Sequence, residues 1–216
     1  MTEILSESTS IGFQSALESI TGIGLIVMII LLNKAAGGEQ KKRAVIIPRS
    51  AGLQNFSFIF PKFIIYPISG FVFSVIASLA AWLVSIPLFE VNDVTFATAL
   101  LCGALAGVCV MLYICFHLTL GTASGRAGMS AAVCITVSVL LPAIMAQVST
   151  DYVYNPFTIQ YLASMILQSR GLSQSQAVNT IVTIAFALAI MGVMFFIALF
   201  AQNAKRIDNS GNEIEL

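Results

Sequence analysis

The chain has 216 residues, of which 58% are hydrophobic and 9% are charged, and its mean hydropathy is +0.94. Soluble domains contain about 25% charged residues, so this chain cannot cover a folded surface with polar groups, and we expect lipid to be its solvent. The formal net charge is zero, which excludes an overall basic field of the kind that binds nucleic acid.

Five apolar runs, taken in chain order, predict the membrane-spanning segments. A helix needs about 20 residues to cross the hydrocarbon core, and its backbone groups must be satisfied within the helix. The alternation that marks the strands of a barrel is missing from these runs. The sequence therefore predicts an all-α integral membrane bundle of about five transmembrane helices. We expect one transmembrane domain over residues 1–206, a disordered cytoplasmic tail over 207–216, and spans at about 11–33, 63–89, 96–120, 129–149 and 179–202.

The basic residues predict how these spans are oriented. Loops on the cytoplasmic side of a membrane are enriched in Lys and Arg. The chain has ten basic residues. All except Arg170 lie between the first two spans, between the third and fourth, or after the last. This distribution predicts a multi-pass protein of the cell membrane with its N-terminus outside and its C-terminus in the cytoplasm.

The segment between the first two spans, residues 34–60, is the most informative cytoplasmic loop. A basic cluster is followed by an apolar patch, and Ser50 is placed to cap a short helix that carries Phe56 and Phe60. Pro61 suits the first turn of the following span. We therefore expect an amphipathic element on the inner membrane surface. It serves either as an anchor on anionic lipid or as a docking site for a cytoplasmic partner.

Residues 154–178 are predicted to form a short helical hairpin on the outer side. Asn155 and Pro156 favour the start of a helix, and Ser173 with Gln176 forms a capping box for the next one. The helix between these signals is too short to cross the membrane. It must either lie in the interface or dip into the bilayer and return.

Small residues four positions apart predict close contacts between helices in lipid. Gly103 and Gly107 form such a pair on the third span. Gly70, Ser74 and Ser78 form a similar row on the second span. These residues serve either packing within one chain or contact between two chains.

The sequence offers little for catalysis or for metal binding. Ser124 lies in a stretch that loosely resembles the nucleophile turn of rhomboid proteases, but Thr122 replaces the glycine of that turn. The histidine, His117, precedes the serine, whereas in that family it follows. The four cysteines form no CxxC pair, and no second histidine and no carboxylate lies near His117 in the sequence. We expect a chain that is not an enzyme and has no cofactor and no metal site.

Three features together resemble a known transporter family. The segment Glu39–Arg43 reads EQKKR, Pro61–Phe63 opens a long helix, and Asn155–Phe157 reads NPF where the outer hairpin begins. In this order, over about Gly22 to Gln202, the chain is similar to the permeases of type-2 ABC exporters. In that family a charged segment and a coupling element lead into a long span, and short outer helices precede the last span.

The resemblance implies the transmembrane permease subunit of an ATP-driven ABC exporter. ATP would bind to a separate cytoplasmic subunit, because this chain has no nucleotide-binding motif. A second permease subunit, identical or different, would complete the pathway, and residues 34–60 would couple ATP hydrolysis to transport. The residues expected to contact the ATP-binding subunit are Glu39, Lys41, Lys42, Arg43 and Arg49.

Two alternatives stay open. Exporters of this type usually have six spans and a cytoplasmic N-terminus, whereas this chain is expected to begin where the second span would lie. A non-transporting membrane scaffold or assembly subunit is therefore the first alternative, and it predicts no ATP-binding partner. An intramembrane enzyme is the second alternative, and it requires Ser124 or His117 to be essential.

Overall fold

The computed structural model of the chain is built mainly of helices. It describes residues 8–38, 54–89, 91–148, 156, 159–169, 174–204, 206–207 and 213–214. Helical structure runs continuously from Thr9 to Gly38 through α1 (Thr9–Ser19), the π-helical η1 (Ile20–Gly24), α2 (Leu25–Asn33) and the π-helical η2 (Lys34–Gly38). The later elements are α5 (Asn55–Leu88), α6 (Phe96–Ser124), α7 (Ala127–Val148), α8 (Ile159–Gln168), α9 (Gln174–Ala204), β1 (Arg206–Ile207) and β2 (Glu213–Ile214).

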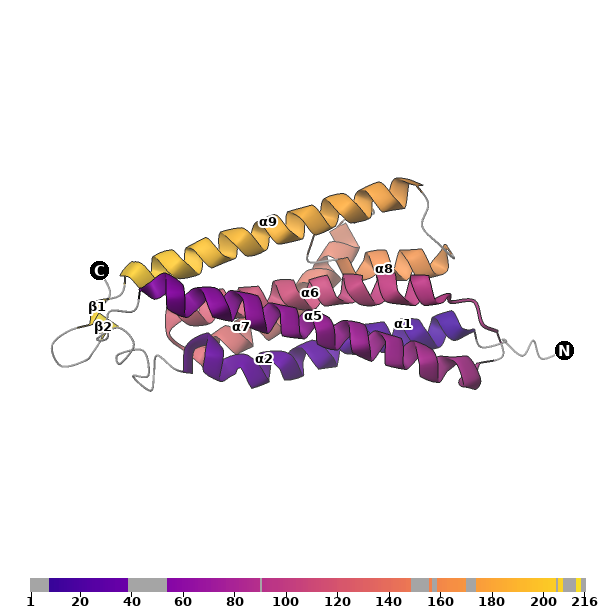
Figure 1. Ribbon diagram of the computed structural model, residues 1–216, viewed down its shortest axis with the longest axis horizontal. Helices are drawn as coiled ribbons and strands as arrows, with labels where there is room; N and C mark the ends of the chain where they lie inside the picture. The colour runs from indigo at the N-terminus through magenta and orange to yellow at the C-terminus, as the bar shows by residue number, and fades with distance from the viewer. Residues whose placement is uncertain are drawn as a thin grey trace.

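The long helices run side by side along the longest axis of the molecule (Figure 1). Within the described residues, four helices are long and apolar enough to cross a membrane, at Thr9–Gly37, Asn55–Leu88, Phe96–Ser124 and Ala177–Ala204. These helices agree with the all-α membrane bundle that the composition predicts. The helix α7 occupies the place of the remaining span, and the total of five spans stays a prediction.

The helix α6 lies at the centre of the bundle. In its most apolar stretch 72% of the residues are buried, whereas the corresponding share is 17–28% in the other three long helices. The four long helices are nevertheless similarly apolar. The outer helices therefore keep most of their apolar side chains available to lipid, and α6 is the surface against which they pack.

The close contact between α5 and α6 depends on small residues from both helices. A Cβ atom added to Gly103 would lie 2.9 Å from the Cβ of Ser78, and one added to Gly107 would lie 3.2 Å from the carbonyl oxygen of Phe71. Ser74 and Ser78 donate their hydroxyl hydrogens to carbonyls of their own helix, at 2.9 and 2.8 Å. The two small-residue rows therefore pack against each other within one chain, without leaving these serine hydroxyls unpaired.

The loop between α5 and α6 caps the start of α1. The backbone N–H and the hydroxyl of Thr9 both donate to the carbonyl oxygen of Val91, at 3.0 and 2.9 Å. The N–H of Ser10 donates to Oδ1 of Asp93 at 2.9 Å. These bonds satisfy donors that a helix leaves unpaired at its first turn. The Asp93 carboxylate also stabilises the positive end of the helix dipole.

The expectation of a separate surface helix before Pro61 is wrong for residues 55–60. α5 begins at Asn55 and continues through Pro61 without interruption. The rings of Phe56 and Phe60 pack against the ring of Phe195 on α9, with centroids 5.9 and 6.1 Å apart. One side of each ring therefore contacts another helix, while Phe56 and Phe60 stay 46% and 43% exposed. A proline inside the helix leaves one carbonyl without its partner, which membrane helices tolerate.

The outer hairpin contains α8, which packs against α6 and α1. Ile159, Leu162 and Ile166 are buried, and the thiol of Cys102 lies 3.6 Å from the carbonyl oxygen of Ala163. Figure 1 shows α8 alongside α6, with its axis nearly parallel to that of α6. This placement favours a segment that dips into the bilayer. α9 begins one residue after Ser173, where the capping signal predicts it, whereas Ser173 itself lies outside the described residues.

The residues after α9 include one short pair of strands. β1 and β2 are antiparallel, with Arg206 opposite Ile214 and Ile207 opposite Glu213. The rest of the predicted tail, residues 208–212 and 215–216, lies outside the described residues.

We expect Gly107→Leu to destabilise the bundle by about 1–3 kcal/mol, because the new side chain would be forced into the α5–α6 contact. Gly22→Leu is the matched control, since a Cβ added at Gly22 meets no atom within 4 Å, and it should leave stability nearly unchanged. The measurement is unfolding in mixed detergent micelles. Equal effects of both substitutions would show that the α5–α6 contact does not determine stability.

Candidate functional site at the basic end of the bundle

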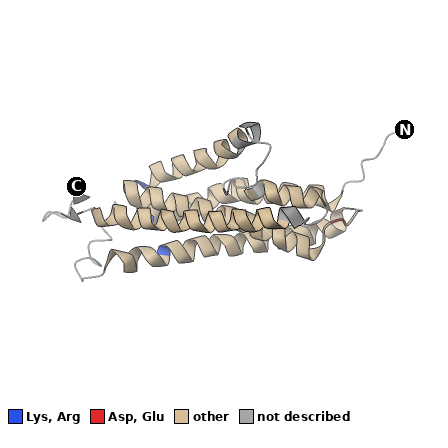
Figure 2. Ribbon diagram, turned by 90° about the horizontal axis from the view of Figure 1, so that it is seen from above, with Lys and Arg blue, Asp and Glu red and all other residues tan. Residues whose placement is uncertain are grey.

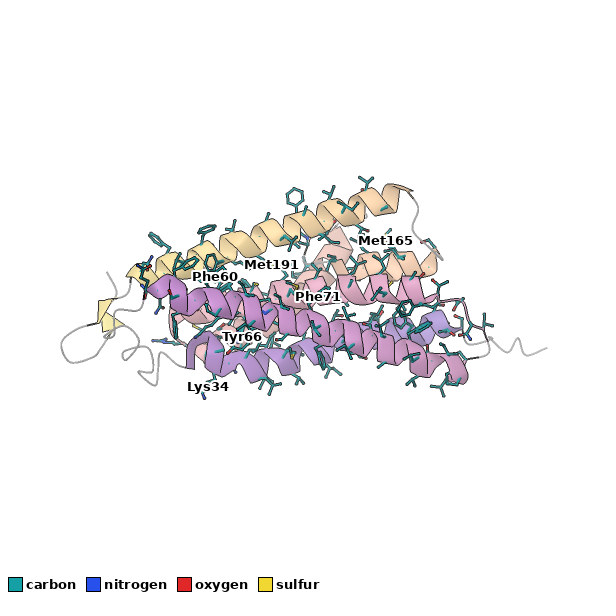
Figure 3. The ribbon with its side chains drawn as sticks, viewed as in Figure 1. Lys34, Phe60, Tyr66, Phe71, Met165 and Met191 are labelled. Carbon is teal, nitrogen blue, oxygen red and sulfur yellow. The ribbon has the colours of Figure 1, made fainter. Side chains whose placement is uncertain are left out.

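Basic side chains gather at one end of the bundle. Lys34 lies where the first helical unit ends, Lys62 near the start of α5, and Arg126 between α6 and α7. Figure 2 shows blue segments toward the end that carries the C-terminus and red at the opposite end. Asp93 contacts the start of α1. Lys34 is exposed and points away from the helices (Figure 3). The charge asymmetry of the sequence is therefore an asymmetry between the two ends of the bundle.

The side chains expected to contact an ATP-binding subunit, Glu39, Lys41, Lys42, Arg43 and Arg49, lie outside the described residues. The structure describes both ends of the segment that carries them. η2 ends at Gly38 and α5 begins at Asn55. The site can therefore be built from the contacts that hold these two ends.

Lys62 joins the two ends of this segment. Its Nζ donates to the carbonyl oxygen of Ala35 in η2 at 3.2 Å, and it lies 4.1 Å from the centroid of the Phe58 ring. A cation is favourable at the C-terminal end of a helix, where carbonyl groups lack partners. The aromatic ring adds a cation–π contact. Lys62 therefore ties the start of α5 to the end of the first helical unit.

η2 also packs directly on the end of α6. A Cβ atom added to Gly37 would lie 2.9 Å from the carbonyl oxygen of Gly121, and one added to Gly121 would lie 2.6 Å from the carbonyl oxygen of Ala36. The empty space beside this contact is only about 10 Å³, about the volume that one water requires. Only glycine allows the two backbones to approach this closely. α6 then ends at Ser124 and is capped by Gly125, whose φ of 64° is left-handed.

The end of α9 is fastened to the same region. The Asn55 side chain donates to Oδ1 of Asn203 at 2.6 Å. Further along the two helices, the Phe63 and Phe195 rings lie 5.6 Å apart, edge to face. Phe60 and Met191 lie nearby on α5 and α9 (Figure 3). A cavity of about 220 Å³ between α5, α6 and α9 is lined mainly by apolar side chains, including these four.

His117 and Ser124 do not share a partner. The hydroxyl of Ser130 donates to the carbonyl oxygen of His117 at 2.7 Å and lies 2.8 Å from Nδ1 of the same residue. Ser124 donates to the carbonyl oxygen of Leu120 at 2.6 Å. His117 is fully buried, and its Nε2 has no hydrogen-bond partner. Through Ser130, His117 joins α6 to α7.

The described residues contain no group of three His, Cys, Asp or Glu side chains that could hold a metal ion. The four cysteines are free thiols and are all buried. Two of the thiols also link helices, since Cys134 on α7 lies 3.4 Å from the carbonyl oxygen of Tyr113 on α6 and Cys102 on α6 lies 3.6 Å from that of Ala163 on α8. The cysteines therefore behave as small core residues of the helices.

Sequence reasoning missed two contacts at the basic end, that of Lys62 with Ala35 and that of Gly37 with Gly121. The sequence pattern places Lys62 only at the opening of a helix. Lys62 and Ala35 are far apart in the sequence, so no local sequence pattern predicts that they are in contact. The signal that the sequence offers for this contact is a basic residue, Lys62, at the predicted start of a helix and next to an aromatic residue.

No protein-family model matches this chain, and comparisons with curated proteins and with solved structures give no match. The similarity to type-2 ABC exporter permeases therefore stays a prediction from the residues quoted above.

We expect Lys62→Met to destabilise the bundle by about 1–2 kcal/mol, because it removes a charged hydrogen bond to Ala35 and a cation at a helix end. Lys34→Met is the matched control, since Lys34 is exposed and points away from the bundle. Unfolding in mixed micelles measures both variants. If Lys34→Met costs as much as Lys62→Met, the bridge to Ala35 has no special role.

Proposed function

We propose that the chain is the transmembrane permease subunit of an ATP-driven ABC exporter. A separate cytoplasmic subunit supplies ATP binding and hydrolysis, since the chain has no nucleotide-binding motif. A second permease subunit completes the transport pathway. Residues 34–60 couple hydrolysis to movement of the helices.

One observation carries this proposal. The two described ends of the charged segment, η2 up to Gly38 and α5 from Asn55, are held together at the basic end of the bundle. Lys62 joins one end to the other, and Gly37 rests on the backbone of Gly121 in the central helix. A force applied to this segment by a bound subunit would therefore reach α6 directly. A loop that served only to connect two spans would not need such contacts.

The same end of the bundle offers a place where helices can separate. α9 meets α5 through the rings around Phe195. Ring contacts of this kind are individually weak, worth about 0.5–1.5 kcal/mol each. The cavity between α5, α6 and α9 is apolar. Its lining suits an apolar or amphiphilic cargo better than an ion. An apolar cargo also agrees with the small number of charged residues in the described helices, which are Glu18, Lys34 and Lys62.

The proposal places the protein in the cell membrane, with the basic end in the cytoplasm. This orientation follows from the enrichment of Lys and Arg in cytoplasmic loops. The N-terminus and the loop that carries Asp93 would then face outward. The ATP-binding subunit would approach the end that carries Lys34 and Arg126.

A non-transporting membrane scaffold is the second candidate, and one observation favours it. The centre of the described bundle is filled by α6, so that a single chain encloses a packed helix instead of a polar path. A scaffold needs no path and no ATP-binding partner. An exporter with this fold would have to form its path between two permease subunits.

Reversal of charge at Lys41, Lys42 and Arg43 to Glu should abolish co-purification of an ATP-binding subunit. The physical reason is that three attractive contacts become repulsive, while the described bundle, which contains none of these residues, stays intact. The measurement is the ratio of subunits in material purified in mild detergent, with unfolding of the bundle followed in parallel.

The matched control reverses Lys205 and Arg206, which are also basic and lie beyond α9. This variant should keep its partner. Normal assembly of the triple variant would refute the coupling role of the segment. A wild-type protein that purifies without any nucleotide-binding subunit would support the scaffold.

The proposed orientation has its own test. Single cysteines at Val91 and at Lys34 should differ in reactivity toward a membrane-impermeant maleimide added to intact cells. Val91→Cys should be labelled from outside, and Lys34→Cys only after the cells are opened. The native cysteines are buried, so the unmodified chain should remain unlabelled. Labelling of Lys34→Cys in intact cells would reverse the orientation.

A further inference from the structure

A second cavity lies at the other half of the bundle, between the first helical unit, α6 and α8. Its volume is about 170 Å³. The polar side chains in its lining are Glu18, Thr21, Tyr161 and Ser164, and the remainder is made by Leu17 and two alanines. It shares no lining residue with the apolar cavity between α5, α6 and α9. The two cavities therefore have different chemistry as well as different positions.

Glu18 is the one acidic residue within the described helices. It lies sixteen residues before Lys34, about 24 Å along the helix at 1.5 Å per residue. The hydrocarbon core of a bilayer is about 30 Å thick. If Lys34 marks one boundary, the carboxylate of Glu18 lies within the opposite leaflet. By this count Glu18 lies about 6 Å inside the opposite boundary, where a charge costs less than at the bilayer centre, but an ionisable residue within a span is still a candidate functional residue.

The carboxylate of Glu18 is only partly satisfied within the described structure. Nε2 of Gln14 donates to its Oε1 at 3.0 Å. The described residues provide no ion-pair partner for it. An ionised carboxylate has about four acceptor positions, so most of them stay available. Glu18 is exposed at the edge of the cavity, where a ligand could reach it.

The wall beside Glu18 also presents an acceptor. Thr21 lies in the π-helical η1, where the backbone departs from the regular α-helix. Its hydroxyl donates to the carbonyl oxygen of Leu17 at 3.0 Å, so that the hydrogen is engaged and the lone pairs remain. π-Helical turns occur frequently at functional sites. The carboxylate and this hydroxyl together favour a positive ligand and disfavour an anion.

We propose that this cavity binds an organic ammonium cation. The positive charge would be balanced by Glu18 and would also be attracted by the Tyr161 ring, as in known sites for quaternary ammonium groups. The alkyl groups would contact Leu17 and the alanines. The size is adequate, since a cavity of about 150 Å³ holds a molecule of benzene. A hard metal ion such as Ca²⁺ needs six to eight oxygen ligands, and the four polar side chains of this lining do not provide them.

This inference does not depend on the exporter proposal. Binding of a cation to the cavity requires no ATP-binding subunit, and loss of coupling at the basic end would not remove Glu18. A soluble amine and the headgroup of a choline lipid both present an organic ammonium cation. The experiment therefore uses the isolated chain in a detergent without any ammonium group, so that neither source is present at the start.

The test is equilibrium binding of radiolabelled tetramethylammonium to the full chain in maltoside micelles. We expect saturable binding that falls at least tenfold in Glu18→Gln, which keeps the shape and removes the charge. Ser164→Leu keeps the charge and fills the cavity, and it should have a similar effect. Glu213→Gln removes an equal charge at the other end of the molecule and should leave binding unchanged. Thermal unfolding confirms that each variant is folded.

Competition then identifies the source and the class of ligand. Displacement by added phosphatidylcholine would assign a lipid headgroup, and lack of displacement would assign a soluble amine; both results support the site. If sodium chloride displaced the label as effectively as unlabelled tetramethylammonium does, the site would take any cation. That result would overturn the proposal. Absence of saturable binding, or equal binding by wild type and Glu18→Gln, would also overturn it.

Discussion

Close backbone contact between α5 and α6 is the constraint on which the rest of the bundle depends. In lipid, helices gain little by hiding apolar side chains from each other, so association relies on packing and on hydrogen bonds. Gly103 and Gly107 allow this approach on α6, and Ser78 provides a small partner on α5. Because α5 lies this close, α6 can be covered on its other sides by the first helical unit, α7, α8 and α9. The central helix is thus defined by its small residues.

The two ends of the bundle are fixed by different chemistry. At the acidic end, a loop carbonyl and the Asp93 carboxylate cap the start of α1. At the basic end, Lys62 holds a helix carbonyl and Gly37 rests on Gly121. Both arrangements satisfy helix ends that would otherwise carry unpaired groups. The basic end differs because a long charged segment begins and finishes there, so its fastening also determines where an outside partner can act.

Much of the fold follows from the sequence because apolar length and charge placement are local properties. They predict the long helices, and α6 begins at Phe96 as expected. The start of α5 was predicted eight residues too late, because Phe56 and Phe60 were assigned to a surface helix. Their pattern is that of an amphipathic helix, and the sequence does not say whether lipid or another helix covers it. The contact between Gly37 and Gly121 joins residues far apart in the chain, and no spacing rule predicts such a pair.

The charged residues within the helices separate structural from functional roles. A charge within a bilayer requires compensation. Lys62 is compensated by a carbonyl oxygen and an aromatic ring, and Lys34 lies at the end of its helix, where it reaches water. Glu18 lies about two and a half turns from the start of α1 and has only a neutral amide as its partner within the described structure. A carboxylate within a span that has no ion-pair partner lowers the stability of the fold and makes no structural contact that would offset this cost. A ligand of opposite charge, held in the adjoining cavity, would account for its presence.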